Sequence, residues 1–456
     1  MSGHQYRSST STSSVWRRLK RSSPPLSWGS RPGWMILSQY GARRDGIHSY
    51  GTSSATSFTS NGEEISFSFD LVEPPGISVI CLDSPKDAST QTANVIAALH
   101  DVVLIRMYYG SGAPIDYYVY KASSDVDASR WRPSLLLLLP AYDDEDIWTS
   151  RDNTGIMSWR TKGKSSFIVA KLTIRFDLWS EIGSPPAIEA HMFRSGSDEW
   201  KVFKDLQVNG ANGSSDLQWW KTDVIVPYQG RFLMWVDYYQ GIILADMSPQ
   251  SEGEDVAPSL WYVPFPVDRI TKNPEHIDYG RGSPQISRCV CATRDGLKFV
   301  SVDHRHTSDW GVGHQDVLKW SHTFRITTWS LREHDYTWRR DVTMYEEEFW
   351  DTLHCSGDHL FPRATPEYPV VNMDNPDAVC FRLKKEPYNF GDPIWMIEVD
   401  MKKKALLAAT SYSMETTSSN EVGTINYARV VSDAPPFSSD LPRYLDGVSD
   451  CKKRRQ

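Results

Sequence analysis

Histidine and cysteine residues gather between positions 289 and 334, where they could bind a metal ion. Cys289 and Cys291 form a Cys-x-Cys pair. The histidines downstream are His304, His306, His314, His322 and His334. Thiolate and imidazole groups are ligands that Zn²⁺ prefers, but these spacings match no zinc finger. In a strand the two cysteines share one face and Val290 takes the other, as in many apolar cores. We therefore predict no metal here, and histidines in polar loops.

Two runs of carboxylates, at 143–146 and 346–348, could bind Ca²⁺ or act as paired acid and base. They lack the spacing of an EF-hand, and charged runs in loops are usually solvated. The sequence also contains no nucleophile elbow, P-loop, dinucleotide fingerprint or His-Glu-x-x-His motif. We predict a protein without catalytic residues or cofactor, and keep as the alternative a propeller hydrolase with a metal in the central channel.

Aromatic residues flank both acidic runs. Tyr142 and Trp148 lie beside the first, and Phe349 and Trp350 beside the second. Aromatic anchors ringed by charge are typical of protein-binding surfaces, so these four residues are predicted to contact a protein or peptide with a basic segment. The alternative is that the aromatic side chains pack inside the fold and the acids only aid solubility.

The elements that must position these residues are β-strands. Two apolar runs, 232–236 and 242–247, flank a short polar turn that ends at Gly241, which is the pattern of a β-hairpin. The first run is apolar on both faces, so we expect the hairpin to lie between two layers. Trp235 is predicted to pack between those layers, and Asp237 to start the turn by hydrogen bonding to nearby backbone.

A strand, a polar turn and a strand opening on tryptophan recur along the chain. Trp200 and Trp338 are separated by two steps of 69 residues, and Trp131 lies one step before Trp200. Further steps fall near 269 and 407, next to apolar runs, and long segments of helical periodicity are absent. Units of about four strands predict an all-β fold, a β-propeller of about six four-stranded blades over residues 34–446.

The composition of the chain argues against nucleic-acid binding and against insertion in a membrane. The chain has 456 residues, 40% of them hydrophobic, and a net charge of −8, which argues against nucleic-acid binding. Six scattered cysteines favour a reducing compartment, and the apolar runs are shorter than the ~20 residues of a membrane span.

Residues 1–33 are rich in Ser and Arg and contain no acid; they are predicted to be a disordered tail, with an organelle transit peptide as the alternative. Residues 447–456 form a basic tail. We expect a monomer in the cytoplasm or nucleus, or in a plastid or mitochondrion if the transit-peptide interpretation holds.

Several short motifs resemble the plant domain of unknown function 1618 family. The hairpin carries Gly230-Arg231, Trp235-Val236-Asp237 and Gly241-Ile242-Ile243. The other matching motifs, in family order, are Trp34-Met35-Ile36-Leu37, Asp295-Gly296-Leu297-Lys298 and Leu441-Pro442-Arg443-Tyr444-Leu445. The strand pattern also resembles the kelch-like propellers that follow F-box segments, although residues 1–33 are too polar to form an F-box. The resemblance implies no catalytic residues, and it agrees with a non-catalytic scaffold that binds a partner through loops at one face of the ring.

Overall fold

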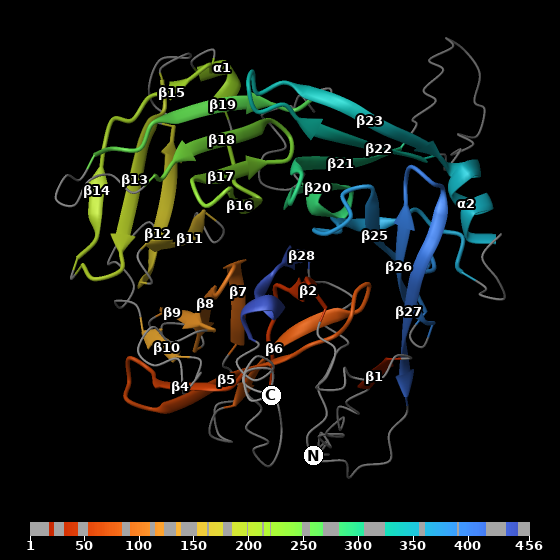
Figure 1. Cartoon of the computed structure of the whole chain (residues 1–456), viewed down its shortest axis with the longest axis horizontal. Coiled ribbons are helices and arrows are strands. Elements are labelled where there is room, and N and C mark those ends of the chain that lie inside the picture. The colour runs from red at the N-terminus through yellow and green to blue at the C-terminus, as the bar shows by residue number, and fades with distance from the viewer. Residues whose placement is uncertain are drawn as a thin grey trace, which may run out of the picture.

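Six β-sheets stand around a central axis, which confirms the predicted six-bladed β-propeller (Figure 1). The structure is a computed structural model that describes residues 18–21, 32–43, 53–83, 92–109, 115–122, 134–137, 153–161, 164–176, 185–197, 199–211, 214–218, 220–248, 256–267, 282–304, 324–354, 361–389, 392–415 and 435–445. None of the helices in these ranges is long and apolar enough to cross a membrane.

The blades follow one another around the ring in chain order, and the strands of each blade are named from the axis outward. The first contains β28 (Pro436–Ser439), β2 (Met35–Ser38), β6 (Ile77–Asp83), β5 (Glu64–Asp70) and β4 (Ala55–Phe58), with β3 (Ala42–Arg43) also paired to β6. The second contains β7 (Thr92–Leu99), β8 (Val102–Tyr108), β9 (Ile115–Lys121) and β10 (Ser134–Leu137). The third contains β11 (Thr154–Thr161), β12 (Lys164–Arg175), β13 (Ala187–Arg194) and β14 (Lys201–Phe203).

The other three blades complete the ring. The fourth contains β16 (Val224–Tyr228), β17 (Phe232–Asp237), β18 (Gly241–Asp246), β19 (Leu260–Pro264) and β15 (Val208–Asn209). The fifth contains β20 (Arg288–Thr293), β21 (Gly296–His304), β22 (Phe324–Leu331) and β23 (Trp338–Tyr345). The sixth contains β24 (Glu367–Val371), β25 (Ala378–Leu383), β26 (Ile394–Asp400), β27 (Ala405–Glu415) and β1 (Arg18–Arg21). Within the described ranges the helical elements are α1 (Ser214–Leu217), α2 (Glu346–His354), η3 (Pro284–Ile286) and η4 (Leu441–Tyr444).

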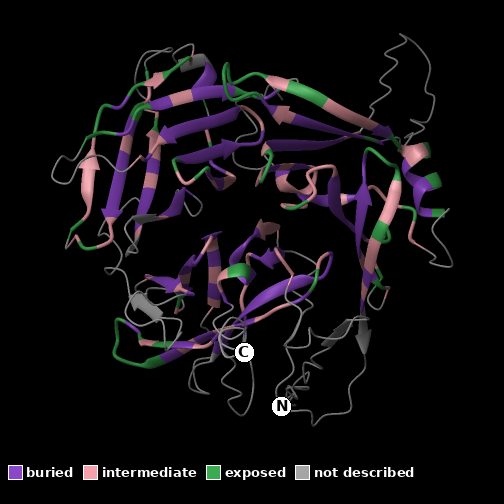
Figure 2. Ribbon diagram, viewed as in Figure 1, coloured by how far each residue is buried: buried purple, intermediate pink, exposed green. Residues whose placement is uncertain are grey.

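The hairpin of β17 and β18 forms the middle of the fourth blade, as predicted, and both of its faces are buried (Figure 2). One face packs on the third blade in the core that contains Trp235, and the other packs on the fifth blade in the core that contains Phe299. Asp237 is fully buried and accepts the backbone N–H of Tyr239 at 2.9 Å. The predictions for Trp235 and Asp237 are therefore confirmed.

The 69-residue interval marks the fourth strand of successive blades. Trp200 directly precedes β14, Trp338 opens β23, and position 407 lies near the start of β27. Trp131 and position 269 lie outside the described residues. The interval could be read from the sequence because every blade presents the same local order of strands and turns.

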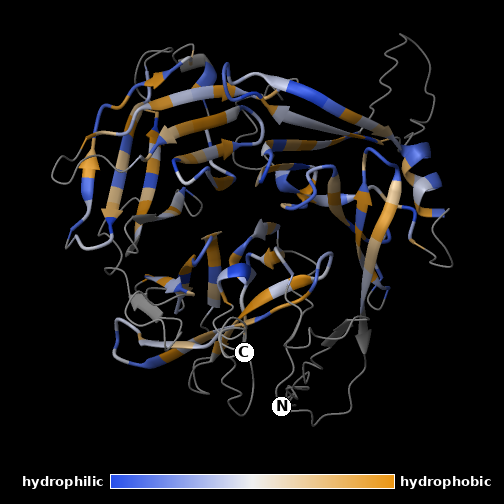
Figure 3. Ribbon diagram, viewed as in Figure 1, coloured by the Kyte–Doolittle hydropathy of each residue, from blue (hydrophilic) through white to orange (hydrophobic). Residues whose placement is uncertain are grey.

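Hydrophobic residues follow the strands of all six blades, whereas β23 and α2 carry hydrophilic stretches at the rim (Figure 3). Gly155 of β11 lies in the seam between the third and fourth blades, where a Cβ atom would lie 2.5 Å from Ile225 Cγ2. Glycine is required there because contacts of that length do not occur between a real Cβ and a side chain.

The ring is closed by a strand from the far end of the chain. β28 becomes the innermost strand of the first blade and pairs antiparallel with β2, so that Met35 lies opposite Ser439. β28 also contacts β24 of the sixth blade, which completes the circle. At the N-terminal end, β1 pairs with β27 at the rim of the sixth blade. The disordered tail over residues 1–33 stays a prediction. The rest of residues 1–31 lies outside the described residues.

The closing segment is joined to the second blade by an ion pair. His100, at the turn between β7 and β8, places Nδ1 2.9 Å from Asp440 Oδ2, and its backbone N–H donates to Asp440 Oδ1 at 2.8 Å. Burial alone would lower the pKa of His100 and raise that of Asp440. The bond between them outweighs burial, so the pKa of His100 lies above 6.5 and the pKa of Asp440 lies below 3.8. Asp101 and Arg443 are the other charged groups that act on His100.

We expect the His100–Asp440 pair to stabilise the ring most between about pH 4 and pH 6.5. A raised histidine pKa contributes stability below the unfolded value of 6.5, and this contribution disappears as the pH rises through the folded value. A lowered aspartate pKa contributes above 3.8 and fades in acid. Thermal unfolding of wild type and His100→Gln should therefore differ more at pH 5.5 than at pH 8.5, by about 0.5–1 kcal/mol for a partly exposed pair. An equal difference at both pH values would contradict this assignment.

Candidate axial cavity and loop face

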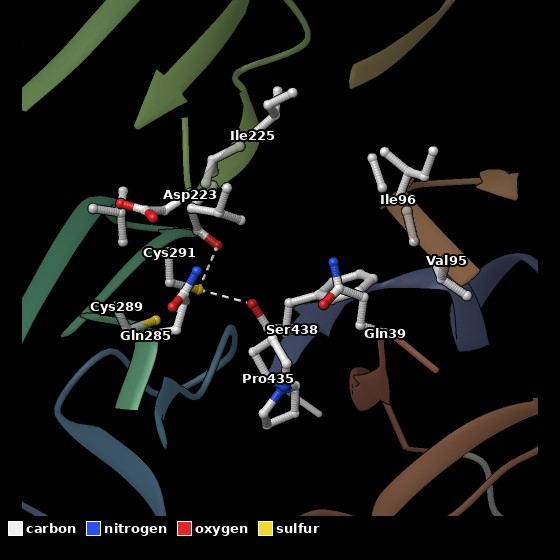
Figure 4. A pocket seen from close by; sticks show the side chains of 18 of the residues that line it. Gln39, Val95, Ile96, Asp223, Ile225, Gln285, Cys289, Cys291, Pro435 and Ser438 are labelled. Atoms are coloured by element: carbon white, nitrogen blue, oxygen red, sulfur yellow. Dashed lines mark hydrogen bonds between the residues drawn. The ribbon is translucent and has the colours of Figure 1, made fainter. Parts of the chain in front are cut away.

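The innermost strands enclose a cavity of about 120 Å³ on the propeller axis (Figure 4). The residues that line it belong to β7, β16, β20, the segment around β24, and β28. The wall is mainly apolar and half-buried, and includes Ile96, Val224, Pro227 and Phe437. Pockets of this kind, with a few polar groups in the wall, are the usual sites of small ligands or inserted side chains.

The innermost strands line the cavity with consecutive residues, and alternation along each strand decides which of them are more exposed. On β7, Asn94 and Ile96 are half-buried and Val95 and Ala97 are buried, and all four line the cavity. Proline is tolerated on these strands because each is the inner edge of its sheet and needs no hydrogen bond toward the axis. Pro227 of β16 and Pro369 of β24 are examples in the cavity wall.

A buried charge network lies where β16 and β20 begin. Asp223 Oδ2 accepts the N–H of Tyr238 at 2.8 Å, and the Arg288 guanidinium donates to the Tyr238 carbonyl. Burial lowers the pKa of Arg288, and the nearby carboxylates of Asp303, Asp237 and Asp223 oppose that shift. The positive charge of Arg288 is thus balanced within the protein, so this network is built to hold the seam between the fourth and fifth blades.

Cys289 and Cys291 lie on one face of β20, as predicted, against the core shared with the sixth blade. Val290 faces the opposite way, into the core shared with the fourth blade. Both cysteines line the cavity, and Cys291 Sγ lies 2.8 Å from Ser438 Oγ of the closing strand. Burial raises the pKa of Cys289 and raises that of Cys291 to about 11, so both thiols are protonated at neutral pH.

The two faces of the ring differ in the length of their connections. We call the face at which β7, β11, β16, β20, β24 and β28 begin the upstream face. The segments that lead into these strands there include 84–91, 138–153, 265–287, 346–366 and 416–435. At the opposite face the same strands pass into their neighbours through the short turns 100–101, 162–163, 229–231 and 294–295, and through 372–377. At the innermost strands the long connections therefore lie on the upstream face, whereas the long connections 122–133 and 247–259, farther from the axis, join strands at the opposite face.

The predicted aromatic anchors have different positions. Tyr142 and Trp148 belong to the 138–153 connection and lie outside the described residues. Phe349 and Trp350 are not in a loop, which is a correction: they lie in α2 and are 0% and 5% exposed. Their rings pack edge-to-face on each other, 5.4 Å apart, and Phe349 also packs on Phe381 of the sixth blade. Burial of this pair matches the alternative of packing inside the fold.

The histidines and acidic runs considered for the alternative metal site do not assemble at the axis within the described ranges. His334 is exposed in the turn before β23 and pairs with Asp335 at 3.2 Å, and His304 ends β21. His306, His314 and His322, like the acidic run 143–146, lie outside the described residues. The other acidic run, 346–348, forms the first turn of α2, where negative charge favours a helix N-terminus. Groups of three or more metal-binding side chains are absent from the part of the chain that the structure describes.

Sequence reasoning missed the contribution of residues 435–440 to the cavity. Pro435, Phe437 and Ser438 reach it only because β28 inserts beside β2, from the other end of the chain. The only local signal was the motif at 441–445, which directly follows this strand.

No curated protein matches the sequence. Among solved structures, the chain is similar to Penicillium chrysogenum alpha-L-arabinanase complexed with arabinobiose, with 10% sequence identity, over 84% of this chain and 97% of that chain. The TM-score is 0.24, so the similarity carries no argument about fold or activity.

The one family match covers three blades in part. It runs from β17 of the fourth blade to β25 of the sixth and includes the Trp235 hairpin and the Cys289–Cys291 strand. Over residues 235–380 the chain matches the family described as protein of unknown function DUF1618, which supports the resemblance read from its motifs.

Proposed function

We propose that this protein is a non-catalytic scaffold that binds a protein partner through the connections of the upstream face. The observation that carries the proposal is a contrast at the innermost strands, whose connections are long at the upstream face and short at the opposite face. Loops on a rigid β scaffold tolerate change better than buried strands, so recognition concentrates in them. The partner remains to be identified, and the plant origin and F-box-propeller likeness stay predictions.

The chemistry of the 138–153 connection indicates the kind of partner. It holds Tyr142 and Trp148 beside the acidic run 143–146, and its flanking strands β10 and β11 fix its ends in the second and third blades. A basic segment with an apolar side chain fits such a loop. Phe349 and Trp350 contribute indirectly, by holding α2 against the blades beside it.

Affinity capture from the same cell extract, with wild type and variants compared by quantitative mass spectrometry, tests this proposal. Tyr142→Ala plus Trp148→Ala should lower the recovery of the specific partner by more than about tenfold, as expected for loss of two aromatic hot spots. Tyr336→Ala is the matched control, because Tyr336 is an exposed aromatic in the turn between β22 and β23. If the double variant and the control retain the same proteins as wild type, at equal thermal stability, the 138–153 connection is not the interface.

A further inference from the structure

We infer that Cys289 and Cys291 form a two-thiol site for a soft monovalent metal ion, such as Cu(I), in the wall of the axial cavity. The two residues are separated by one position on β20, so their side chains leave the same face with Cα atoms about 6.6 Å apart. Figure 4 shows both sulfur atoms on the same side of the pocket. This inference does not depend on the proposed protein-binding role of the upstream face.

Both thiols contact the backbone of the same residue, Val371 of β24. Cys291 Sγ lies 3.7 Å from the carbonyl oxygen of Val371, and the Cys289 thiol is also hydrogen-bonded to the backbone of Val371. Two side chains that leave the same face of a strand and contact the backbone of the same residue can share a single ion after small rotamer changes. Ser438 Oγ, 2.8 Å from Cys291 Sγ, provides a neutral oxygen beside the site.

The number of donors selects the metal. Thiolates select soft ions, and Cu(I) accepts two sulfur ligands in a linear arrangement. Zn²⁺ normally requires four ligands, and the described residues offer no third histidine, cysteine or carboxylate at this place. On binding, each thiol gives its proton to solvent, and the two sulfur–metal bonds leave a bis-thiolate complex of net charge −1 without any change in oxidation state.

The other described cysteines provide a comparison within the same chain. Cys81 and Cys380 are 1% and 0% exposed, belong to the core between the first and sixth blades, and do not line the cavity. They behave as small apolar residues. Cys289 differs because it is only half-buried and opens toward the cavity, where an ion can reach it.

Anaerobic titration of the reduced full-length protein with Cu(I), against the chelator bicinchoninate, tests the site. Wild type and Cys380→Ser should each retain one Cu(I) per chain at this site. Cys289→Ser and Cys291→Ser should each lower the affinity by at least about 100-fold, because a two-ligand site does not survive the loss of one ligand. Unchanged copper retention in both Cys289→Ser and Cys291→Ser would overturn the inference.

A second measurement on wild type alone keeps the test independent of variant folding. Partial unfolding followed by iodoacetamide and peptide mass spectrometry should show Cys289 and Cys291 protected from alkylation in the copper-loaded protein, relative to the copper-free protein. Cys81 and Cys380 should be alkylated equally in both samples. X-ray absorption should show two sulfur scatterers at the bound copper. Equal alkylation of Cys289 and Cys291 with and without copper would refute the site.

Discussion

Replacing Trp235 with alanine is expected to lower the free energy of unfolding by about 3–5 kcal/mol. Trp235 is 0% exposed and lies in the core between the third and fourth blades, with Leu233 and Ile243 in the same core. Its Nε1–H donates to the carbonyl of Asn153 at 2.8 Å, so the variant loses both apolar packing and a buried hydrogen bond. Chemical denaturation followed by circular dichroism should report the loss.

Two control variants separate the causes. Trp235→Phe keeps much of the ring volume and should cost less than Trp235→Ala, because the Asn153 carbonyl still accepts the N–H of Leu172 at 3.2 Å. Leu407→Ala removes a side chain that is 47% exposed and should change stability by less than about 1 kcal/mol. If Trp235→Ala were as stable as Leu407→Ala but failed to bind the partner, Trp235 would be a binding residue and its role as a core residue would be wrong.

Replacing Arg382 with methionine is expected to cost about 3–5 kcal/mol, because it would leave the carboxylate of Glu367 largely buried without its partner. Arg382 lies opposite Glu367 in the β24–β25 ladder, with Nη2 2.6 Å and Nε 3.1 Å from Glu367 Oε2. Their side chains are 4% and 15% exposed. The guanidinium also lies over the ring of Tyr368, 4.1 Å from its centre.

The double variant Arg382→Met plus Glu367→Gln distinguishes an unpaired charge from lost packing. It should recover a large part of the stability, because neither residue then carries a charge into the blade. Arg231→Met is the control at the surface, since the Arg231 side chain is 56% exposed and pairs with Asp246 at 2.6 Å. Its effect should be much smaller, and it should shrink further in high salt. If Arg382→Met and Arg231→Met lowered the free energy of unfolding equally, the buried pair would contribute no more to stability than the surface pair.

The sequence predicted those parts of the fold that depend on local pattern. The two apolar runs around Gly241 specify a hairpin by their local pattern alone. The tryptophans at 200 and 338 mark equivalent strands because the third and fifth blades repeat the same order of strands and turns. Helix α2 was missed because its three glutamates were read as a solvated run. Phe349, Trp350 and Leu353 carried a signal, since residues three and four positions apart share one face of a helix.

The axial cavity could not be predicted in the same way. Its wall combines Ile96, Pro227, Cys291, Pro369 and Ser438, which come from five different blades. Their proximity depends on the number of blades and on which strand closes the ring, and neither is a property of a local stretch. The Cys289–Cys291 pair was visible in the sequence, but its exposure to a cavity follows only from the neighbouring blades.

Closure of the ring by β28 also affects how the protein folds during its synthesis. Because the partner of β2 is synthesised some 400 residues later, the first blade keeps an unpaired inner edge while the ribosome makes the other five. Unpaired apolar edges invite pairing with other chains, and Met35, Ile36 and Leu37 are all fully buried in the finished ring. The nascent chain is therefore most prone to aggregation, and most dependent on chaperones, before residues 436–439 are synthesised. A truncation before residue 436 would leave the first blade without its innermost strand.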